Sequence, residues 1–213
     1  MNTGIPCRFL KDRCQRILAS VDWGLSVTII YCSDPHTECP QDKTTMRLHS
    51  WLSPKCRVGA SPLEGMGVFA ASSIATGELV CIWGGVVYTA AEVDTLGGDA
   101  HFLTHPHEVA EGFYLGSTSL TAIDGAERFN HSCHPNVGVK GQILVYARRV
   151  IEAEEELVFD YETTDVSLMP FQCCCGVAEC RRVIDGNAWK SLEFQKKNAG
   201  WLTSYIADKV ARL

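Results

Sequence analysis

Three cysteines near the C-terminal end constrain the fold of this chain more than any other feature. Cys173, Cys175 and Cys180 lie within eight residues, and Gly176 permits a tight turn among them. Thiolates so close together are typical of a structural zinc site, which prefers four tetrahedral ligands. Cys174 is expected to point away, because alternate residues of an extended segment face opposite sides. The fourth ligand must then come from elsewhere in the chain, unless Cys174 or a water supplies it.

The polar segment 130–136 contains the most attractive fourth ligand. It begins at Asn130, and Cys133 has no obvious packing role within it. Side chains of this kind bond backbone groups, so the segment predicts a tight loop, and Asn130 and His131 could equally orient a bound ligand. His131 and His134 could bind a metal, but cysteine is favoured over them here. A redox-active or simply buried thiol cluster is the alternative for the cysteines.

From Cys56 onward, short apolar runs separated by glycine turns predict a fold that is mainly β, with flanking helices. The predicted strands lie at 65–70, 79–83, 113–115, 120–123, 143–147 and 155–161. Short helices are predicted at 90–96 and 187–197. A C-terminal helix is predicted from Leu202, Tyr205, Ile206 and Val210 at helical spacing, with Thr203 near its start.

Composition limits the partners that the protein can take. The formal net charge of −6 argues against a general nucleic-acid binder, which would carry a basic stripe, and gives a modest edge to a basic partner. Eleven cysteines, an odd number, disfavour a complete disulfide framework and favour metal ligation in a reducing compartment. We expect no membrane span, because no apolar run reaches about 18 residues. The sequence predicts an intracellular protein, without deciding between nucleus and cytoplasm.

Five motifs then occur in one order along the chain. They are 65–70, 74–78, 128–136, 155–161 and 171–181. In this order they resemble the SET-domain protein lysine methyltransferases with a post-SET zinc site, over roughly residues 55–185. The segment 184–190 also resembles the compact SET proteins that are common in bacteria.

The resemblance implies an architecture and a division of the chain. The fold would be the SET-domain β-clip of small sheets with a pseudoknot, a post-SET zinc site and C-terminal helices. The chain would divide into an N-terminal extension of unknown role, a SET domain, a post-SET segment and a C-terminal helical segment. Their bounds would be 1–54, 55–165, 166–185 and 186–213.

The resemblance also implies S-adenosylmethionine-dependent methylation of a lysine ε-amine in a basic protein or peptide, such as a histone tail. Tyr161 would be the catalytic tyrosine beside the transferred methyl group. Phe159, which lacks a hydroxyl, suggests a site that permits di- or trimethylation. The cofactor would be held by Gly65, Met66, Gly67, Tyr114, Arg128, Phe129, Asn130, His131 and Tyr161. Structural zinc would be bound by Cys133, Cys173, Cys175 and Cys180.

Two other functions stay open at this point. A non-catalytic, zinc-stabilised peptide-binding module would keep the fold, and it is supported by Trp83 in place of the family's commoner tyrosine and by Glu154 in place of a glycine. A thiol redox protein could be built on residues 173–175. The sequence decides neither the target lysine nor the oligomeric state.

Overall fold

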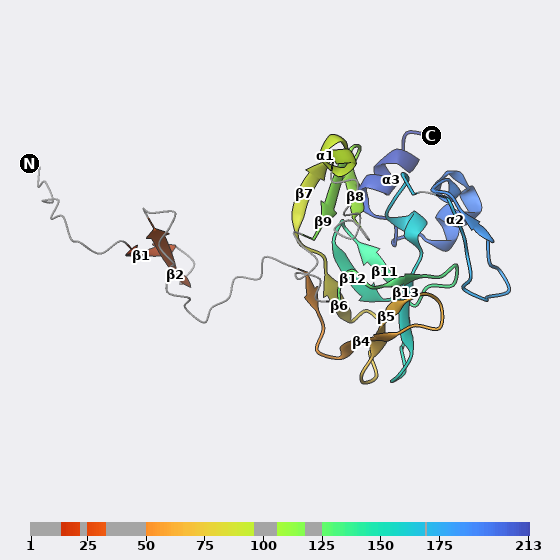
Figure 1. Cartoon of the computed structure of the whole chain (residues 1–213), viewed down its shortest axis with the longest axis horizontal. Helices are drawn as coiled ribbons and strands as arrows, with labels where there is room; N and C mark the ends of the chain where they lie inside the picture. The colour runs from red at the N-terminus through yellow and green to blue at the C-terminus, as the bar shows by residue number, and fades with distance from the viewer. Residues whose placement is uncertain (1–13, 22–24, 33–49, 96–105, 118–124, 169) are drawn as a thin grey trace, which may run out of the picture. The chain divides into compact units, whose positions relative to one another are not determined.

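The computed structural model describes residues 14–21, 25–32, 50–95, 106–117, 125–168 and 170–213 (Figure 1). Contacts divide the chain into two units, Met1–Met46 and Arg47–Leu213. In the first unit, β1 (Cys14–Val21) and β2 (Leu25–Cys32) form an antiparallel pair in which Cys14 lies opposite Cys32. The second unit carries all the predicted site residues.

A four-stranded sheet brings the predicted site segments together. Its strand order is β10-β13-β5-β4. The strands are β4 (Cys56–Ala60), β5 (Met66–Ala70), β10 (Asn130–His131) and β13 (Glu156–Phe159). β10 runs parallel to β13, with Asn130 opposite Val158 and His131 opposite Phe159. The start of the predicted loop 130–136 is therefore a short strand, held in register by the strand that precedes Tyr161.

A second four-stranded sheet has the order β11-β12-β6-β3. Its strands are β3 (Trp51–Leu52), β6 (Leu79–Ile82), β11 (Val137–Lys140) and β12 (Leu144–Ala147). β3 lies within the predicted extension 1–54, yet it pairs with β6 and belongs to the second unit. The predicted domain boundaries stay predictions.

The smaller sheets complete the β structure. β7 (Val86–Thr89), β8 (His107–Ala110) and β9 (Phe113–Gly116) form one in the order β7-β9-β8, and β14 (Phe171–Gln172) pairs with β15 (Val183–Ile184). The mainly β fold of small sheets is thus confirmed. The strand predicted at 120–123 lies outside the described residues.

The helices are few and short, as predicted. Within the described residues they are α1 (Ala90–Thr95), α2 (Leu192–Lys197), α3 (Ser204–Val210) and the 3₁₀ turns η3 (Tyr161–Thr163) and η4 (Ala188–Lys190). Thr203 caps α3 by accepting a hydrogen bond from the backbone N–H of Ile206. The single helix predicted at 187–197 is wrong. Ser191 has extended backbone angles, which end η4 and begin α2.

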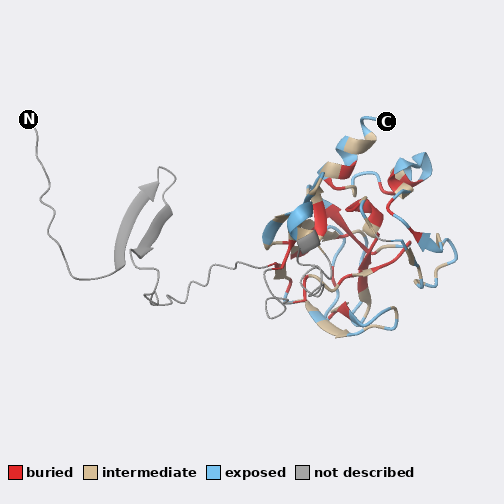
Figure 2. Ribbon diagram, turned by 45° about the horizontal axis from the view of Figure 1, so that its top comes forward, coloured by how far each residue is buried: buried red, intermediate tan, exposed pale blue. Residues whose placement is uncertain are grey.

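Buried residues from both four-stranded sheets form one core, to which Phe129 and Phe159 of the site belong; Figure 2 shows the buried residues in red. The core contains Val68, Ile74, Val137, Val145, Ile151 and Leu157, all fully buried, together with Phe129 and Phe159. A separate cluster of Trp189, Phe194 and Ile206 packs the C-terminal segment. Phe129 directly precedes β10, and Phe159 ends β13 two residues before Tyr161, so core packing positions both the strand and the turn of the site.

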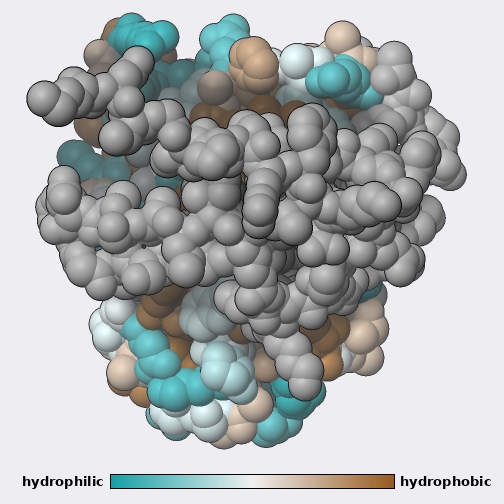
Figure 3. Space-filling view, turned by 90° about the vertical axis from the view of Figure 1, so that its left-hand side faces the viewer, coloured by the Kyte–Doolittle hydropathy of each residue, from teal (hydrophilic) through white to brown (hydrophobic). Residues whose placement is uncertain are grey.

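On the described surface, hydrophilic and hydrophobic side chains lie side by side (Figure 3). The exposed large apolar residues are Met66, Val86, Val87, Phe113, Val150, Val183, Leu192 and Leu213. Among the described helices, none is both long and apolar enough to cross a membrane.

Asn136 joins the end of the 130–136 segment to β13. Its side chain is 1% exposed. Its Nδ2 donates to Glu155 Oε1 (2.9 Å) and to the carbonyl of Glu156 (2.7 Å), while its Oδ1 accepts from the N–H of Val158 (2.8 Å). One amide therefore satisfies several groups that would otherwise be buried without partners.

We predict that Asn136→Ala lowers the free energy of unfolding by about 3 kcal/mol, because it leaves a buried N–H and a buried carbonyl unpaired. Urea denaturation measures this loss. Asn187→Ala, at an exposed position, should change the free energy by less than about 0.5 kcal/mol. Equal effects of the two substitutions would contradict this role of Asn136.

Candidate functional site

The four predicted metal ligands come together. The sulfur atoms of Cys133, Cys173, Cys175 and Cys180 all lie within 4.8 Å of one another. Those of Cys133 and Cys173 are 3.9 Å apart. Tetrahedral zinc with Zn–S bonds of about 2.3 Å places its sulfurs about 3.8 Å apart. The donor set and its spacing therefore fit zinc with little movement.

The neighbouring candidates stay outside this cluster. Cys174 is exposed and is not part of it, and His134 is exposed as well. His131 Nε2 lies 3.5 Å from Cys133 Sγ, while its Nδ1 accepts from the N–H of Tyr161 (3.2 Å). Since Nδ1 accepts, the proton of the neutral ring is assigned to Nε2, which donates to the sulfur.

The charges at the cluster favour a divalent cation. Burial raises the pKa of Cys133 to about 11 and raises the pKa of Cys173 above its usual range. Burial also acts to raise the pKa of Cys175, but hydrogen bonds to its sulfur outweigh burial and lower the value to about 6. Four adjacent thiolates repel one another, so full deprotonation requires a compensating positive charge.

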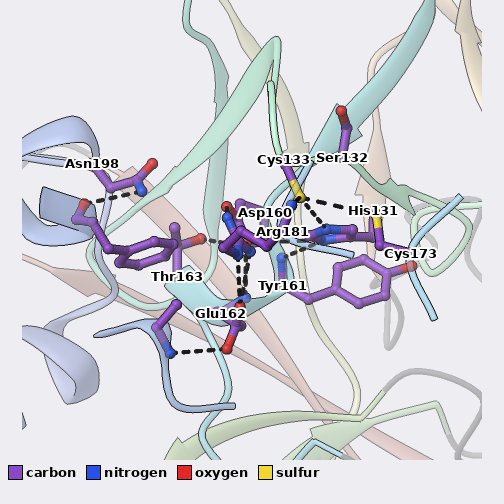
Figure 4. Close-up of polar contacts among 12 residues, drawn as sticks. His131, Ser132, Cys133, Asp160, Tyr161, Glu162, Thr163, Cys173, Arg181 and Asn198 are labelled. Carbon is purple, nitrogen blue, oxygen red and sulfur yellow. Dashed lines mark hydrogen bonds and ion pairs between the residues drawn. The ribbon is translucent and has the colours of Figure 1, made fainter. Parts of the chain in front are cut away.

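Arg181 connects the cysteine segment to the turn that holds Tyr161 (Figure 4). Its guanidinium donates two hydrogen bonds to Asp160 (2.6 and 2.7 Å) and one to Glu162 (3.1 Å), and both carboxylates are 1% exposed. The N–H of Arg181 also donates to Cys133 Sγ (3.4 Å). Removing either side of such a network would leave an unpaired buried charge.

Tyr161 itself is firmly placed at the start of η3. Its hydroxyl donates to the carbonyl of Phe129 (2.9 Å), and its ring packs against His131 and Phe159 at centroid distances of 5.2 and 4.9 Å. Burial raises the pKa of Tyr161 above its usual range, and the carboxylates of Glu64 and Glu156 add to the increase. The hydroxyl is therefore protonated at neutral pH.

Tyr161 lines two cavities, and Phe171 does the same. The larger cavity has a volume of about 580 Å³ and the smaller about 200 Å³. The smaller cavity is bordered by Leu63, Glu64, Asn130, His131 and residues 171–175. The residues that border the larger cavity include Trp83, His107, Tyr114, Phe129, Phe159 and Asp165.

The predicted cofactor residues are thus divided between the cavities. Asn130, His131 and Tyr161 line the smaller cavity, whereas Tyr114 and Phe129 line the larger one. Gly65, Met66, Gly67 and Arg128 are lining residues of neither. The carbonyl of Met66 does accept from Asn130 Nδ2 (3.3 Å), which connects the 65–67 segment to a residue that lines the smaller cavity. The roles of all these residues stay predictions.

The larger cavity has an aromatic wall. The ring of Trp83 lies 4.5 Å from that of His107 and 5.4 Å from that of Phe159, and its indole N–H donates to the carbonyl of Ala126 (3.1 Å). Burial lowers the pKa of His107 to about 4, so its imidazole is uncharged at neutral pH. The wall is therefore apolar, aromatic and neutral.

Two carboxylate residues, Glu127 and Asp165, also line this cavity. Asp165 is 8% exposed, and its Oδ1 accepts hydrogen bonds from the N–H and the hydroxyl of Ser167 (2.8 and 2.9 Å). The Ser167 hydroxyl in turn accepts from Tyr114 (3.1 Å). Burial raises the pKa of Asp165. A cationic side chain is the natural partner of a carboxylate in such a place.

Comparison with known proteins identifies the domain. The family model of the SET domain matches residues 65–162. A histone-lysine N-methyltransferase of Cryptococcus neoformans var. neoformans serotype D, H3 lysine-4 specific, is 29% identical over 144 residues, which are 59% of this chain and 9% of that protein. A histone-lysine N-methyltransferase of Candida albicans, H3 lysine-36 specific, is 24% identical over 174 residues, which are 75% of this chain and 20% of that protein.

A solved structure of KRYPTONITE in complex with mCHG DNA and SAH is 24% identical, with a TM-score of 0.47, over 60% of this chain and 28% of that one. The chain spans no more than a fifth of the length of the two methyltransferases. Residues 65–162 are a SET domain. This confirms the resemblance drawn from the five motifs, whereas the post-SET zinc site stays a prediction.

Several residues that shape the site carried no prediction. Arg181, Asp160, Glu162 and Asp165 act through partners distant in sequence or through burial, neither of which a motif reports. Trp83 was noted only as a departure from the family. Its large indole in a run otherwise typical of a strand is the single signal that could have marked it.

We predict that the purified protein holds about one zinc per chain, because four cysteines in tetrahedral reach bind zinc and release their protons. Metal analysis by plasma mass spectrometry measures the ratio. Cys175→Ser should lose most of the metal. Cys174→Ser is the matched control, since it changes an adjacent exposed thiol outside the cluster, and it should keep the full amount. Zinc loss in both variants, or in neither, would rule out the four-cysteine site.

Proposed function

We propose that this chain transfers a methyl group from S-adenosylmethionine to the ε-amine of a lysine in a protein. The observation that carries the proposal is the position of Tyr161 on the wall of both cavities. A cofactor and a substrate that occupy separate cavities can then meet beside one residue. The membership of residues 65–162 in the SET-domain family gives the same assignment.

The smaller cavity is the proposed cofactor site. Asn130 and His131 would hold the amino-acid end, and the carboxylates of Glu64 and Glu156 lie near enough to influence Tyr161 and would favour a cation. When bound, S-adenosylmethionine would supply a methyl group on a sulfonium sulfur. An uncharged lysine amine would take up this methyl group, the carbon–sulfur bond electrons would stay on sulfur as a neutral thioether, and the methylated ammonium product would then release a proton to water. The Cys133, Cys173, Cys175 and Cys180 cluster would hold zinc in a structural role and fix the 171–175 wall.

The larger cavity is the proposed lysine site. Its aromatic wall of Trp83, His107 and Phe159 would take the apolar stem of a lysine. Removing the proton of a free lysine near pH 7 costs about 4.6 kcal/mol, from its pKa of about 10.4. An apolar, neutral wall disfavours the ammonium form and lowers this cost. Asp165 would attract the ammonium as it arrives.

Tyr161 would orient the reacting groups and not remove the proton. Its pKa is raised, so its anion is scarce at neutral pH. Its hydroxyl is fixed by the carbonyl of Phe129, which leaves the oxygen lone pairs to face developing positive charge. Alignment of amine, methyl and sulfur would supply much of the rate.

Histone tails are the proposed substrate class. The names of the two relatives specify histone H3 with different lysines, and the net charge of −6 suits a basic partner. The target lysine is accordingly not assigned. A nuclear or cytoplasmic location and the absence of direct nucleic-acid binding both remain part of the proposal.

We predict that Tyr161→Phe lowers methyl transfer at least 100-fold, because the hydroxyl acts in the transition state. Incubation of core histones with S-adenosylmethionine carrying a labelled methyl group measures the transfer. Binding of S-adenosylmethionine and the thermal midpoint should change little. Tyr146→Phe, which removes a hydroxyl from β12 away from both cavities, should keep full activity.

Retained transfer by Tyr161→Phe would overturn the assignment of this residue. A wild-type protein that binds S-adenosylmethionine or histone peptides but transfers no methyl to any lysine-rich protein would favour the non-catalytic peptide-binding module.

We predict that Phe159→Tyr shifts the product of the reaction towards monomethyl-lysine. The phenylalanine lies in ring contact with Tyr161, and an added hydroxyl would occupy space that a methylated amine needs. Mass spectrometry of the product peptide at long reaction times measures the ratio of mono-, di- and trimethyl-lysine. An unchanged ratio in an active variant would show that Phe159 does not limit the degree of methylation.

A further inference from the structure

A carboxylate next to the proposed cofactor site has an unusually complete set of partners. Glu156, at the start of β13, accepts from the hydroxyl of Ser61 at both oxygens (2.9 Å each). Its Oε1 also accepts from Asn130 Nδ2 (2.8 Å). Glu156 therefore joins the turn that follows β4 to the first residue of β10.

The turn that Ser61 begins forms one border of the smaller cavity. The Ser61 hydroxyl oxygen accepts from the N–H groups of Leu63 (2.9 Å) and Glu64 (3.3 Å), and Leu63 and Glu64 line that cavity. The Ser61 N–H donates to the carbonyl of Gly65 and closes the turn. Through the Ser61 hydroxyl, Glu156 thus holds the turn that brings Leu63 and Glu64 to the border of the smaller cavity.

The same carboxylate determines the orientation of the Asn130 side chain. Asn130 Nδ2 faces Glu156 Oε1 and the carbonyl oxygens of Glu64 (3.2 Å) and Met66 (3.3 Å). All three are pure acceptors, so only the amide NH₂ can face them. The amide oxygen must then be on the other side, and within the described chain it accepts no hydrogen bond.

Gly67 leaves room for this arrangement. A Cβ at this position would lie 2.2 Å from Glu156 Oε1 and 3.1 Å from Asn130 Nδ2. The first distance is far inside van der Waals contact, so any side chain here would displace the carboxylate. Position 67 therefore requires glycine, because any side chain there would clash with the carboxylate of Glu156.

We infer that Glu156 is a positioning residue that turns the Asn130 amide oxygen towards the smaller cavity as the acceptor for the α-ammonium group of the cofactor. This inference rests on the proposed function, because it assigns a role within the cofactor site. Glu156 itself does not touch the cofactor. Its effect is restricted to the amino-acid end of the ligand, which is the end that carries an ammonium group.

The binding of two ligands distinguishes an effect on the amino-acid end of the cofactor from a general effect on the cavity. S-adenosylhomocysteine and 5′-methylthioadenosine share an adenosine and an uncharged thioether, but only the first has the amino-acid end. We expect Glu156→Ala to weaken S-adenosylhomocysteine binding about tenfold, since a hydrogen bond to a charged group is lost, and to leave 5′-methylthioadenosine binding unchanged. Glu156→Gln, which keeps an acceptor for Asn130, should restore most of the affinity. Titration calorimetry on the full chain measures each value.

Two further variants make the test sharp. Glu156→Leu keeps bulk above Gly67 but offers no acceptor, so it should show the same selective loss even if Glu156→Ala does not fold. Glu155→Ala is the matched control, because it removes the adjacent carboxylate, which bonds Arg149 and Asn136 and not Asn130. It should leave the ratio of the two affinities at the wild-type value.

Equal weakening of both ligands, or of neither, in Glu156→Ala or Glu156→Leu would overturn the inference while the proposed function stands. A wild-type chain that binds neither ligand would overturn the inference together with the proposed cofactor site.

Discussion

The parallel contact between β10 and β13 is the constraint on which the rest of the site depends. It places Asn130 and His131 beside the strand that leads into Tyr161. His131 then contacts both halves of the site, because one ring nitrogen accepts from the N–H of Tyr161 and the other faces Cys133 Sγ. Burial lowers the pKa of His131 to about 4, so this connection stays neutral and intact at physiological pH. A neutral ring can serve both neighbours, whereas a doubly protonated ring would lose the acceptor that Tyr161 uses.

The ion network around Arg181 gives the contact its energetic support. Asp160 and Glu162 flank Tyr161 and are almost completely buried, so each needs a cation or several donors. Arg181, which directly follows Cys180, supplies both the positive charge and the hydrogen-bond donors. Breaking a buried pair of this kind costs about 3–5 kcal/mol in other proteins. The cysteine segment and the turn of Tyr161 are for this reason expected to be stable or unstable together.

Much of the site could be predicted from the sequence, because its parts carry local signals. Cysteine spacing predicted that Cys173, Cys175 and Cys180 lie together, the polar segment 130–136 suggested Cys133 as the fourth member, and the apolar runs predicted β5, β6, β9, β12 and β13. The break at Ser191 could not be predicted, since the residues on both sides have helical spacing. The division of the predicted cofactor residues between two cavities was also hidden. Tyr114 and Phe129 come from segments whose facing depends on how β9 and the core pack, and no motif encodes that geometry.

The partners of Asp160 and Glu156 could not be predicted from the sequence for a different reason. Asp160 and Glu156 sit in a family motif, but their partners Arg181 and Ser61 lie 21 and 95 residues away along the chain. Only the folded chain shows that Asp160 is paired with Arg181 and that Glu156 accepts a hydrogen bond from Ser61 beside the smaller cavity.

The most direct test of the account is a crystal structure of the chain with S-adenosylhomocysteine and a lysine-containing histone peptide bound together. The account predicts the cofactor product beside Asn130 and the lysine side chain between Trp83 and Phe159, with sulfur and amine nitrogen meeting next to the Tyr161 hydroxyl. Both ligands on one side of Tyr161, or a lysine that does not enter the aromatic cavity, would contradict it.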